Sequence, residues 1–183
     1  MENYHLASAF NIIQQDSTNI FSGCTKDAKL ELRATIIDLV LATDFSRHLE
    51  VLGQFNSRRA AGGMSVDKRD DRLLWLKMAL KCADISHTAK STEMHLKWTA
   101  NITEEFFRQG DKEKEVNLAI SPFMDRSKPE VPKSQCGFIN FLVLPLYKAF
   151  AEEFSDVTVC VKSLEDNLAY WKSKEEQKTN ESK

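Results

Sequence analysis

The most informative stretch of the sequence is Leu73-Leu74-Trp75-Leu76-Lys77-Met78-Ala79-Leu80-Lys81-Cys82-Ala83-Asp84-Ile85-Ser86-His87. It predicts a helix that is followed by polar residues. The apolar positions at helical spacing are Leu73, Leu76, Leu80 and Ala83. Asp84 follows this stripe directly, and a buried carboxylate costs several kcal/mol unless a partner neutralises it. The partner could be a helix N-terminus, an arginine or a metal cation. His87 is expected on the same face, where an ordinary structural Asp84–His87 hydrogen bond is the alternative to a functional pair.

Length and composition indicate one globular domain. The chain has 183 residues, of which 42% are hydrophobic and 28% are charged, and such values suit a protein with a sizeable core. The formal net charge is -2, so nothing in the charge balance favours binding to nucleic acid or to a membrane surface. We see no apolar run long enough to span a membrane and no signal peptide. A cytoplasmic location is therefore expected.

The four cysteines are Cys24, Cys82, Cys136 and Cys160. They are widely spaced and contain no C-x-x-C pair, and most of them lie among apolar residues. We therefore expect reduced thiols in the core of an intracellular protein.

Prolines and glycines are few, and no segment alternates apolar and polar residues for long, so the sequence predicts an all-α fold. A first helix is expected at about 4–21. Its inward positions include Leu6, Phe10, Ile13 and Ile20. Thr25 is predicted to cap a second, long helix from about Lys26 to Asn56. On that helix Asp44 and His48 lie four residues apart, the spacing of a local ion pair.

The middle of the chain is expected to hold a linker, a helix and an ordered loop. Residues 57–67 (SRRAAGGMSVD) are basic and contain glycine, which is typical of a flexible loop. Ser91 or Thr92 is predicted to cap a helix at about 93–109, with Gly110 just beyond its end. One face of this helix is expected to carry His95, Trp98, Ile102 and Phe106. The charged residues 111–131 are expected to form a short helix followed by an ordered loop that is suited to being a binding wall.

For the last part of the chain, the sequence predicts two helices and a polar tail. An apolar helix from about Ser134 to Phe154 should be kinked or lose a hydrogen bond at Pro145. A final helix is expected from about Val159 to Lys174. Its apolar positions are Val161, Leu164, Leu168 and Trp171. We therefore expect one domain at residues 1–174 and a polar tail at 175–183 that frays.

Six short blocks, taken together and in order, resemble one enzyme family. They are ENYHLA (2–7), LATD (41–44), CADIS (82–86), EEFFRQGD (104–111), MDR (124–126) and SQCGFI (134–139). No single block is decisive, but six in the right order are hard to explain by chance. In these blocks the chain resembles the catalytic domain of the class I 3′,5′-cyclic nucleotide phosphodiesterases, over nearly its whole length except the tail.

The resemblance implies a compact, HD-like, multi-helix domain with a deep pocket that holds zinc and a second divalent ion, magnesium or manganese. Enzymes of this family hydrolyse the 3′ phosphoester of cAMP, cGMP or both to the 5′-monophosphate. Two cations suit this chemistry because they hold a bridging hydroxide near neutral pH and neutralise phosphate charge. A cyclic nucleotide is thus the expected ligand.

The family's functional residues can be placed on this sequence one at a time. Asp84 matches the aspartate that ligates zinc. Gln135 matches the glutamine that hydrogen-bonds the purine edge, and its amide can serve adenine or guanine after a rotation. Phe138 matches the aromatic residue that stacks on the base. Ile102 matches the apolar residue on the opposite face of the base, with Phe106 one turn further along. Without the resemblance, simple core packing would be the favoured interpretation of Phe138, Ile102 and Phe106.

The remaining matches lie around the substrate and the metals. His87 and His95 correspond to positions near the purine and ribose, and the presence of two histidines there favours acceptance of both nucleotides. Glu2 and His5 match a block beside the metals, as groups that hold water or support the ligands. Asp44 matches a polar residue on the pocket floor.

Two further metal-binding histidines, a second aspartate and the general-acid histidine of the family have no counterpart here. In the family they precede the block that stands at residues 2–5, so no catalytic residue is expected in this chain. The resemblance therefore implies a catalytic domain with its N-terminal third missing. A metal site needs three or four ligands, so we expect the chain alone to be inactive. The alternative is a non-catalytic helical module that binds a nucleotide or pairs with other subunits, and a homodimer is a further expectation.

Overall fold

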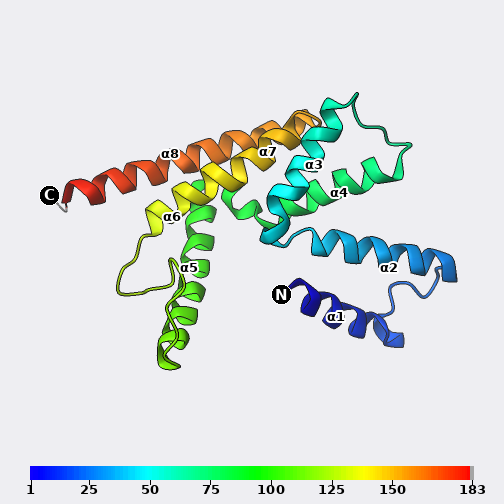
Figure 1. Cartoon of the computed structure of the whole chain (residues 1–183), viewed down its shortest axis with the longest axis horizontal. Coiled ribbons are helices and arrows are strands. Elements are labelled where there is room, and N and C mark those ends of the chain that lie inside the picture. Colours follow the sequence, from blue (N-terminus) through cyan, green and yellow to red (C-terminus); the bar gives the residue numbers. More distant parts are fainter. Residues whose placement is uncertain (182–183) are drawn as a thin grey trace. The chain divides into compact units, whose positions relative to one another are not determined.

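The computed structural model describes residues 1–181, and all secondary structure in this range is helical, which confirms the all-α prediction. The α-helices are α1 (Glu2–Ile13), α2 (Lys26–Leu41), α3 (His48–Ala60), α4 (Arg69–Asp84), α5 (Thr92–Glu115), α6 (Val131–Phe138), α7 (Leu144–Ala151) and α8 (Thr158–Glu181) (Figure 1). The chain forms two compact units, which meet between Asp84 and Ile85 along the sequence. Among the described helices, none combines the length and the apolar character that crossing a membrane requires.

Helix α1 is shorter than expected, because the chain leaves the helix at Ile13 and not near Phe21. A run of polar residues follows, and such side chains compete with helical hydrogen bonds. The carboxamide oxygen of Asn19 accepts a hydrogen bond from the Phe21 amide at 3.0 Å. Leu6 is buried as predicted. Ile20 is 74% exposed, so the prediction that it faces inward was wrong.

The predicted long second helix is two helices. Thr25 caps α2 as expected, since its hydroxyl oxygen accepts from the Ala28 amide at 3.3 Å. The continuation to Asn56 is wrong, because the carboxylate of Asp44 accepts from the Ser46 amide at 2.8 Å and starts a short 3₁₀ turn. Helix α3 begins only after this turn. Asp44 therefore acts as a helix cap at a corner of the chain.

The loop between α3 and α4 is held by a buried carboxylate. Helix α3 continues to Ala60, so the predicted loop at 57–67 begins too early. Asp71, at the start of α4, accepts hydrogen bonds from Nε and Nη2 of Arg58 at 2.6 and 3.1 Å and from the Ser65 amide at 2.9 Å. These bonds, first of all those from Arg58, lower the pKa of Asp71. The loop end is thus tied to two helices of the same unit.

Helix α4 buries a different face from the predicted one. Its buried side chains are Asp71, Met78, Lys81 and Cys82. Leu76 is 48% exposed, and Ala83 and Asp84 are exposed. Apolar residues occupy nearly every position of 73–80, so several stripes fit the helical period. The face that turns inward was decided by packing against α2 and α3.

Lys81 is the buried charge that joins α4 to the end of α2. Its side chain is 3% exposed, and its ammonium donates to the carbonyl oxygen of Ala42 at 2.9 Å. This carbonyl lies just after the last turn of α2, where main-chain acceptors lack a helical partner. Burial lowers the pKa of Lys81, while the charges of Asp84 and Asp44 oppose that shift.

The second unit is organised by α8, which packs against α5, α6, α7 and the 3₁₀ turn η3 (Ser86–Ala89). Leu164, Leu168 and Trp171 are buried as predicted. The prediction that the helix ends near Lys174 is wrong, because α8 reaches Glu181 through residues that favour helix. Residues 182–183 of the predicted tail lie outside the described part.

The apolar helix before α8 is interrupted close to Pro145, as the sequence predicted. Helix α6 begins at Val131, and a π-helical segment, Ile139–Val143, separates it from α7. Pro145 lies just after this segment. Because proline lacks an N–H and clashes with the carbonyl four residues earlier, a wider turn accommodates it. The interruption is confirmed, although the helical stretch begins and ends three residues earlier than predicted.

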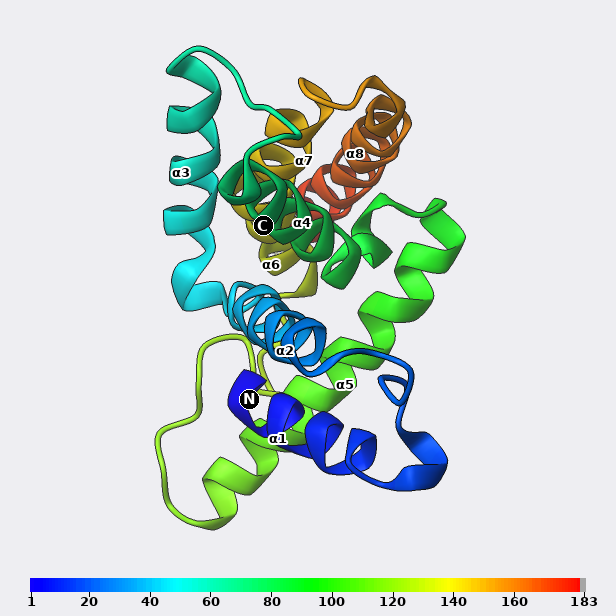
Figure 2. The ribbon, with the colours of Figure 1, turned by 90° about the vertical axis from the view of Figure 1, so that its right-hand side faces the viewer.

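Helix α5 does not end at Gly110. It continues to Glu115, and the glycine lies buried inside it. A Cβ atom at Gly110 would overlap the carbonyl oxygen of Met124, so glycine is needed for the close approach of the following loop. Figure 2 shows this loop leaving α5 and returning to α6. The glycine therefore reports a packing contact and not a helix terminus.

All four cysteines are free thiols, but only Cys82 is buried. Cys24, Cys136 and Cys160 are half-buried, so the expected core position was wrong for these three. Burial raises the pKa of Cys136 to about 11.

Candidate functional site

A pocket in the second unit lies between α5, the loop after it and the start of α6. Its lining residues are Ile102, Thr103, Phe106, Phe123, Glu130, Val131, Ser134 and Gln135. Three predicted site residues, Ile102, Phe106 and Gln135, therefore share one pocket, whereas Phe138 is not in its lining. The cavity has a volume of about 20 Å³, which is room for about one water molecule. A larger ligand requires the lining side chains to move apart.

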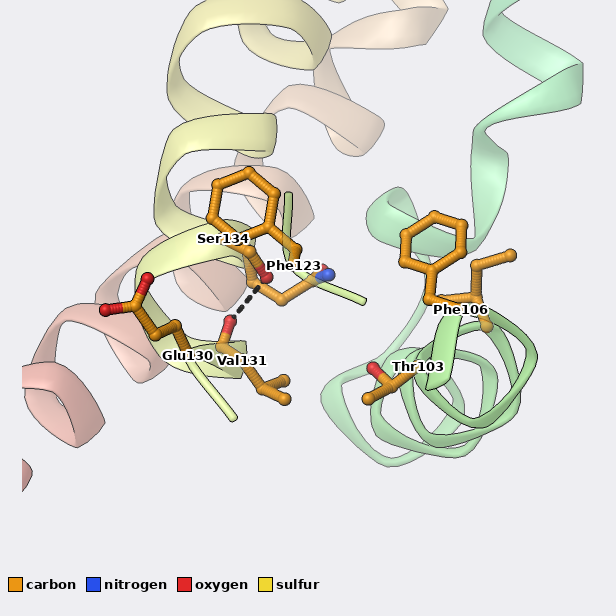
Figure 3. A pocket seen from close by; sticks show the side chains of 8 residues that line it. Thr103, Phe106, Phe123, Glu130, Val131 and Ser134 are labelled. Atoms are coloured by element: carbon orange, nitrogen blue, oxygen red, sulfur yellow. Dashed lines mark hydrogen bonds between the residues drawn. The ribbon is translucent and has the colours of Figure 1, made fainter. Parts of the chain in front are cut away.

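Helical spacing explains how the two walls are built. Thr103 and Phe106 project from α5 on one side, and Val131 and Ser134 lie opposite them at the start of α6 (Figure 3). The Ser134 hydroxyl donates to the Val131 carbonyl oxygen at 3.0 Å. Because this hydroxyl is engaged within its own helix, the polar character of the pocket rests largely on Gln135 and Glu130.

Gln135 is 8% exposed, and its carbonyl oxygen Oε1 has no hydrogen-bond partner among the described residues. A buried acceptor without a donor costs about 1–3 kcal/mol. Such a group is retained where a ligand supplies the missing donor. Gln135 therefore brings one buried unsatisfied acceptor to a pocket that apolar and polar side chains line together.

The loop wall was predicted only in outline, and its key residue was missed. Phe123 lines the pocket with a φ of 67°. A bulky residue in this left-handed region is strained by about 1–3 kcal/mol, and such strain gathers at functional sites. No local sequence signal identifies the conformation, because glycine or asparagine is the usual residue there.

Charged side chains hold this loop against α5. Arg126 binds Glu104 at 2.7 and 3.2 Å and Asp111 at 3.0 and 3.1 Å, and it lies over the ring of Phe107. The hydrogen bond from Arg126, followed by that from Arg108, lowers the pKa of Glu104 to about 2. These contacts fix one end of the pocket wall. A second cavity of about 300 Å³, with Arg126, Phe107 and Trp171 in its lining, lies in the same unit.

His87 and His95 lie together, and neither belongs to the lining of the pocket. Their rings stack with centroids 5.6 Å apart and planes 19° apart. His95 is fully buried, and the indole N–H of Trp171 donates to its Nε2 at 2.7 Å. Burial, with a smaller contribution from the charge of His87, lowers the pKa of His95 to about 4. Burial also lowers the pKa of His87.

The predicted metal-side residues belong to the first unit. Asp84 is the last residue of α4 and its side chain is exposed, so the argument from a buried carboxylate was wrong. The prediction that His87 lies on the same helical face as Asp84 was wrong too, because α4 ends at Asp84. Glu2 has a lowered pKa, chiefly from a main-chain hydrogen bond. His5 is exposed, and the pKa of Asp44 is lowered by its hydrogen bonds with Ser46.

These residues do not make a metal centre by themselves. Within residues 1–181, no three or more His, Cys, Asp or Glu side chains are grouped so that they could hold an ion. Asp84 alone supplies one carboxylate, whereas a zinc site uses three or four ligands. The described residues alone therefore do not fit the expected pair of ions.

The sequence matches the family model described as 3′5′-cyclic nucleotide phosphodiesterase over residues 1–164. The chain belongs to this family. The match confirms the resemblance carried by the six blocks.

Named phosphodiesterases agree with this assignment. The chain is 36% identical over 181 residues to the rat 3′,5′-cyclic-AMP phosphodiesterase 4C, covering 95% of this chain and 34% of that protein. It is 35% identical to the probable 3′,5′-cyclic-AMP phosphodiesterase pde-4 of Caenorhabditis elegans, covering 95% of this chain and 27% of that protein. The chain therefore spans 34% of the length of the rat relative and 27% of that of the nematode relative.

Solved phosphodiesterases share the fold at 30% sequence identity. The phosphodiesterase domain of Salpingoeca rosetta rhodopsin phosphodiesterase superposes with a TM-score of 0.92, covering 99% of this chain and 56% of that one. LmjPDEB1 in complex with IBMX gives a TM-score of 0.89, covering 96% of this chain and 53% of that one. The chain corresponds to about half of each solved phosphodiesterase chain.

Proposed function

We propose that this chain forms the purine-binding part of a cyclic nucleotide phosphodiesterase domain, and that the protein hydrolyses the 3′ phosphoester of cAMP to the 5′-monophosphate. The observation that carries the proposal is the unpartnered Oε1 of Gln135, buried in a pocket that Ile102 and Phe106 line. The names of the rat and nematode relatives favour cAMP.

The chemistry of an amide suits a purine edge. For adenine, Oε1 of Gln135 would accept from the exocyclic amino group and Nε2 would donate to the neighbouring ring nitrogen. A rotated amide would serve guanine, so acceptance of cGMP belongs to the same proposal. Ile102 and Phe138 would enclose the two faces of the base, and Phe106 would lie beyond them. Entry of the base requires Phe106 and Phe123 to separate, because the cavity now holds little more than one water.

We also propose which residues of this chain would lie at the metal site. Asp84 would be the contribution of this chain to a site for zinc and a second divalent ion, magnesium or manganese, with Glu2, His5 and Asp44 in support. The other ligands would come from polypeptide outside this sequence. The 183-residue chain alone is accordingly proposed to lack hydrolase activity. A cytoplasmic location, the domain limits 1–174 and 175–183, and a homodimer stay predictions of the sequence.

Nucleotide binding by the chain itself tests the pocket. Titration calorimetry with cAMP and with cGMP should detect binding, and Gln135→Ala should weaken it at least tenfold, the effect of about 1.4 kcal/mol. Gln54→Ala is the matched control, because Gln54 is an exposed glutamine on α3. Equal binding by the Gln135→Ala variant, or no binding by the wild type, contradicts the proposed purine site.

Hydrolysis is tested separately. The 183-residue chain should turn over neither nucleotide, while a longer polypeptide with upstream sequence should do so in a manner that a chelator abolishes. Chelator-insensitive turnover by the longer polypeptide counts against a metal-dependent phosphodiesterase. Nucleotide binding without turnover in the longer polypeptide would favour the non-catalytic module.

A further inference from the structure

The loop between α5 and α6 is fastened to the last turn of α5 through Ser121. Its amide donates to Oε2 of Glu113 at 2.7 Å, and its hydroxyl donates to Oε1 of the same carboxylate at 2.8 Å. Gln109, one turn earlier on α5, also donates to Oε1, at 2.8 Å. The hydrogen bond from Gln109, followed by those from Ser121, lowers the pKa of Glu113, so this carboxylate is negatively charged at neutral pH. We call the two hydrogen bonds between Ser121 and Glu113 the loop latch.

Ser121 also begins the tight turn that carries Phe123 into the lining of the pocket. The Met124 amide donates to the carbonyl oxygen of Ser121 at 3.1 Å, which closes the turn. Pro122 occupies the second position, and the φ of 67° at Phe123 is the one that a type II turn requires at the third. Such a strained conformation persists only where its surroundings hold it. The turn is held by Ser121 before it and by the ion pairs of Arg126 with α5 after it.

Ser121 stands out in the sequence as well. It is the only serine or threonine of the chain that is followed by proline. The dipeptide Ser-Pro is the acceptor that proline-directed protein kinases recognise. The Ser121 side chain is half-buried, and Pro122 and Phe123 after it are exposed, so the dipeptide lies on a surface loop. Exposed loops are where enzymes that act on a folded chain gain access to it.

We propose that Ser121 is a phosphorylation site for a proline-directed protein kinase, and that its phosphorylation opens the loop latch and releases the pocket wall formed by Phe123. In this reaction Oγ of Ser121 attacks the γ-phosphorus of ATP and the Oγ–P bond forms. The bond from that phosphorus to the ADP oxygen breaks, its electron pair leaves with ADP, and the hydroxyl proton passes to a base of the kinase. The consequence for ligand binding rests on the proposed nucleotide site, whereas the modification itself does not.

A phosphate on Ser121 turns an attractive contact into a repulsive one. Phosphoserine carries a charge of about −1.5 to −2 near neutral pH, and its ester oxygen has no proton to donate. The phosphate would face the carboxylate of Glu113 in the last turn of α5, where the helix dipole also disfavours negative charge. Lys112 and Lys114 belong to the same turn, but neither is paired with Glu113 within the described chain. The latch is therefore expected to open.

Opening the latch leaves the turn with the Arg126 anchor and without the Ser121 anchor. The positive φ of Phe123 can then relax, and its ring can leave the pocket lining. Because the cavity of about 20 Å³ admits a base only after this wall moves, the phosphorylated chain is expected to bind a nucleotide faster.

Kinase treatment of the 183-residue chain tests the site. The chain is incubated with Mg²⁺, ATP and purified proline-directed kinases of the cyclin-dependent and mitogen-activated classes. Peptide mass spectrometry should find phosphate on Ser121. Ser121→Ala and Pro122→Ala should abolish it, whereas Ser127→Ala, at an exposed serine of the same loop, should not. Absence of phosphate on Ser121 with both classes of kinase overturns the modification site.

Amide hydrogen exchange tests the latch without depending on a kinase. Phosphoserine is encoded genetically at position 121, and the protection factor of the amide at this position should fall about tenfold or more. In Glu113→Gln, which removes the repelling charge, the same phosphate should lower the protection factor much less. Glu115→Gln is the matched control, because Glu115 is exposed in the same turn of α5, and it should keep the full effect. Unchanged protection in the phosphorylated chain overturns the opening of the latch.

Nucleotide binding separates this proposal from the proposed function. The association rate of a fluorescent cAMP analogue, measured by stopped flow, should rise about threefold or more on phosphorylation. If the unmodified chain binds no nucleotide, the proposed function fails, and mass spectrometry and hydrogen exchange still decide the site and the latch. If the chain binds at an unchanged rate although the latch has opened, control of the pocket by Ser121 is overturned.

Discussion

The two buried charges of α4 have hydrogen-bond partners, whereas two buried neutral groups of the second unit keep an atom without one among the described residues. In the first unit, Asp71 is bound by Arg58 and by a main-chain amide, and Lys81 is bound by the carbonyl of Ala42. In the second unit, Gln135 and His87 each keep a buried atom without a partner among the described residues. The paired groups join helix ends and loops. Gln135 lines the pocket, whereas His87 lies outside its lining.

This difference follows from what each group does for the folded state. A buried charge is tolerated only when it is paired, so the bonds of Asp71 and Lys81 are conditions of folding. A neutral amide or imidazole costs much less to leave unpaired, and a ligand can recover that cost. The comparison separates residues that maintain the fold from residues that are available for binding, and each half of it can be tested.

The largest expected effect is a loss of about 3 kcal/mol of stability in the second unit as the pH falls from about 6.5 to about 4. The pKa of His95 is about 4 in the folded chain against an ordinary 6.5. The unfolded chain therefore takes up the proton first, so stability is complete above about pH 6.5 and declines below it. Urea denaturation at about pH 7 and about pH 4, followed by tryptophan fluorescence, measures this loss.

Two histidine variants identify the source of that acid sensitivity. His95→Gln should reduce the pH dependence in this window, whereas His5→Gln, at an exposed position on α1, should leave it unchanged. Paired carboxylates such as Glu104, with a pKa of about 2, lose their contribution only at lower pH. A full pH dependence in the His95→Gln variant would show that another group is responsible.

The variant Asp71→Asn tests the role of the paired charges in the first unit. Loss of the carboxylate removes the charge-assisted bonds from Arg58, so the melting temperature of the first unit should fall by roughly 5 °C or more. Thermal unfolding followed by circular dichroism measures the change. Asp70→Asn is the matched control, since Asp70 is the exposed neighbour in the same helical turn, and its effect should be small. Equal melting temperatures for the two variants would contradict the role given to Asp71.

The smallest expected change in stability comes from replacing Gln135, whose buried Oε1 has no partner among the described residues. Gln135→Leu keeps the side-chain bulk and removes an unsatisfied acceptor, so the free energy of unfolding should stay within about 0.5 kcal/mol or rise. Asn167→Leu in the same unit is the contrasting variant, because it removes a buried amide whose bonds are all made, and it should cost about 3 kcal/mol. Urea denaturation compares the two. A large loss in Gln135→Leu would mean that its amide serves the fold.

Features that depend on a few neighbouring residues were predicted well. Thr25 caps α2 and Pro145 interrupts the apolar helix, since a hydroxyl at a helix start and a missing N–H act within one turn. Ile102, Phe106 and Gln135 were placed in one pocket through the family resemblance and not through periodicity. Their grouping depends on two helices meeting, which a single sequence shows only when a related fold is recognised.

Features that depend on contacts between distant residues were missed. The buried face of α4 could not be chosen, because apolar residues surround the helix at 73–80. Gly110 looked like a helix end, but it makes room for the backbone of Met124. The left-handed Phe123 and the partner of His95 on α8 have no local signature at all.

The sequence alone predicted the helical class, the family and three of the residues that line the pocket, Ile102, Phe106 and Gln135, because helical periodicity, caps and short motifs are properties of neighbouring residues. Only the tertiary structure decided which side of each helix is buried, that Asp84 is exposed, and that Trp171 occupies one nitrogen of His95. These outcomes depend on contacts between residues far apart in the chain, such as the 76 positions between His95 and Trp171. Burial and hydrogen-bond partners exist only once such segments meet.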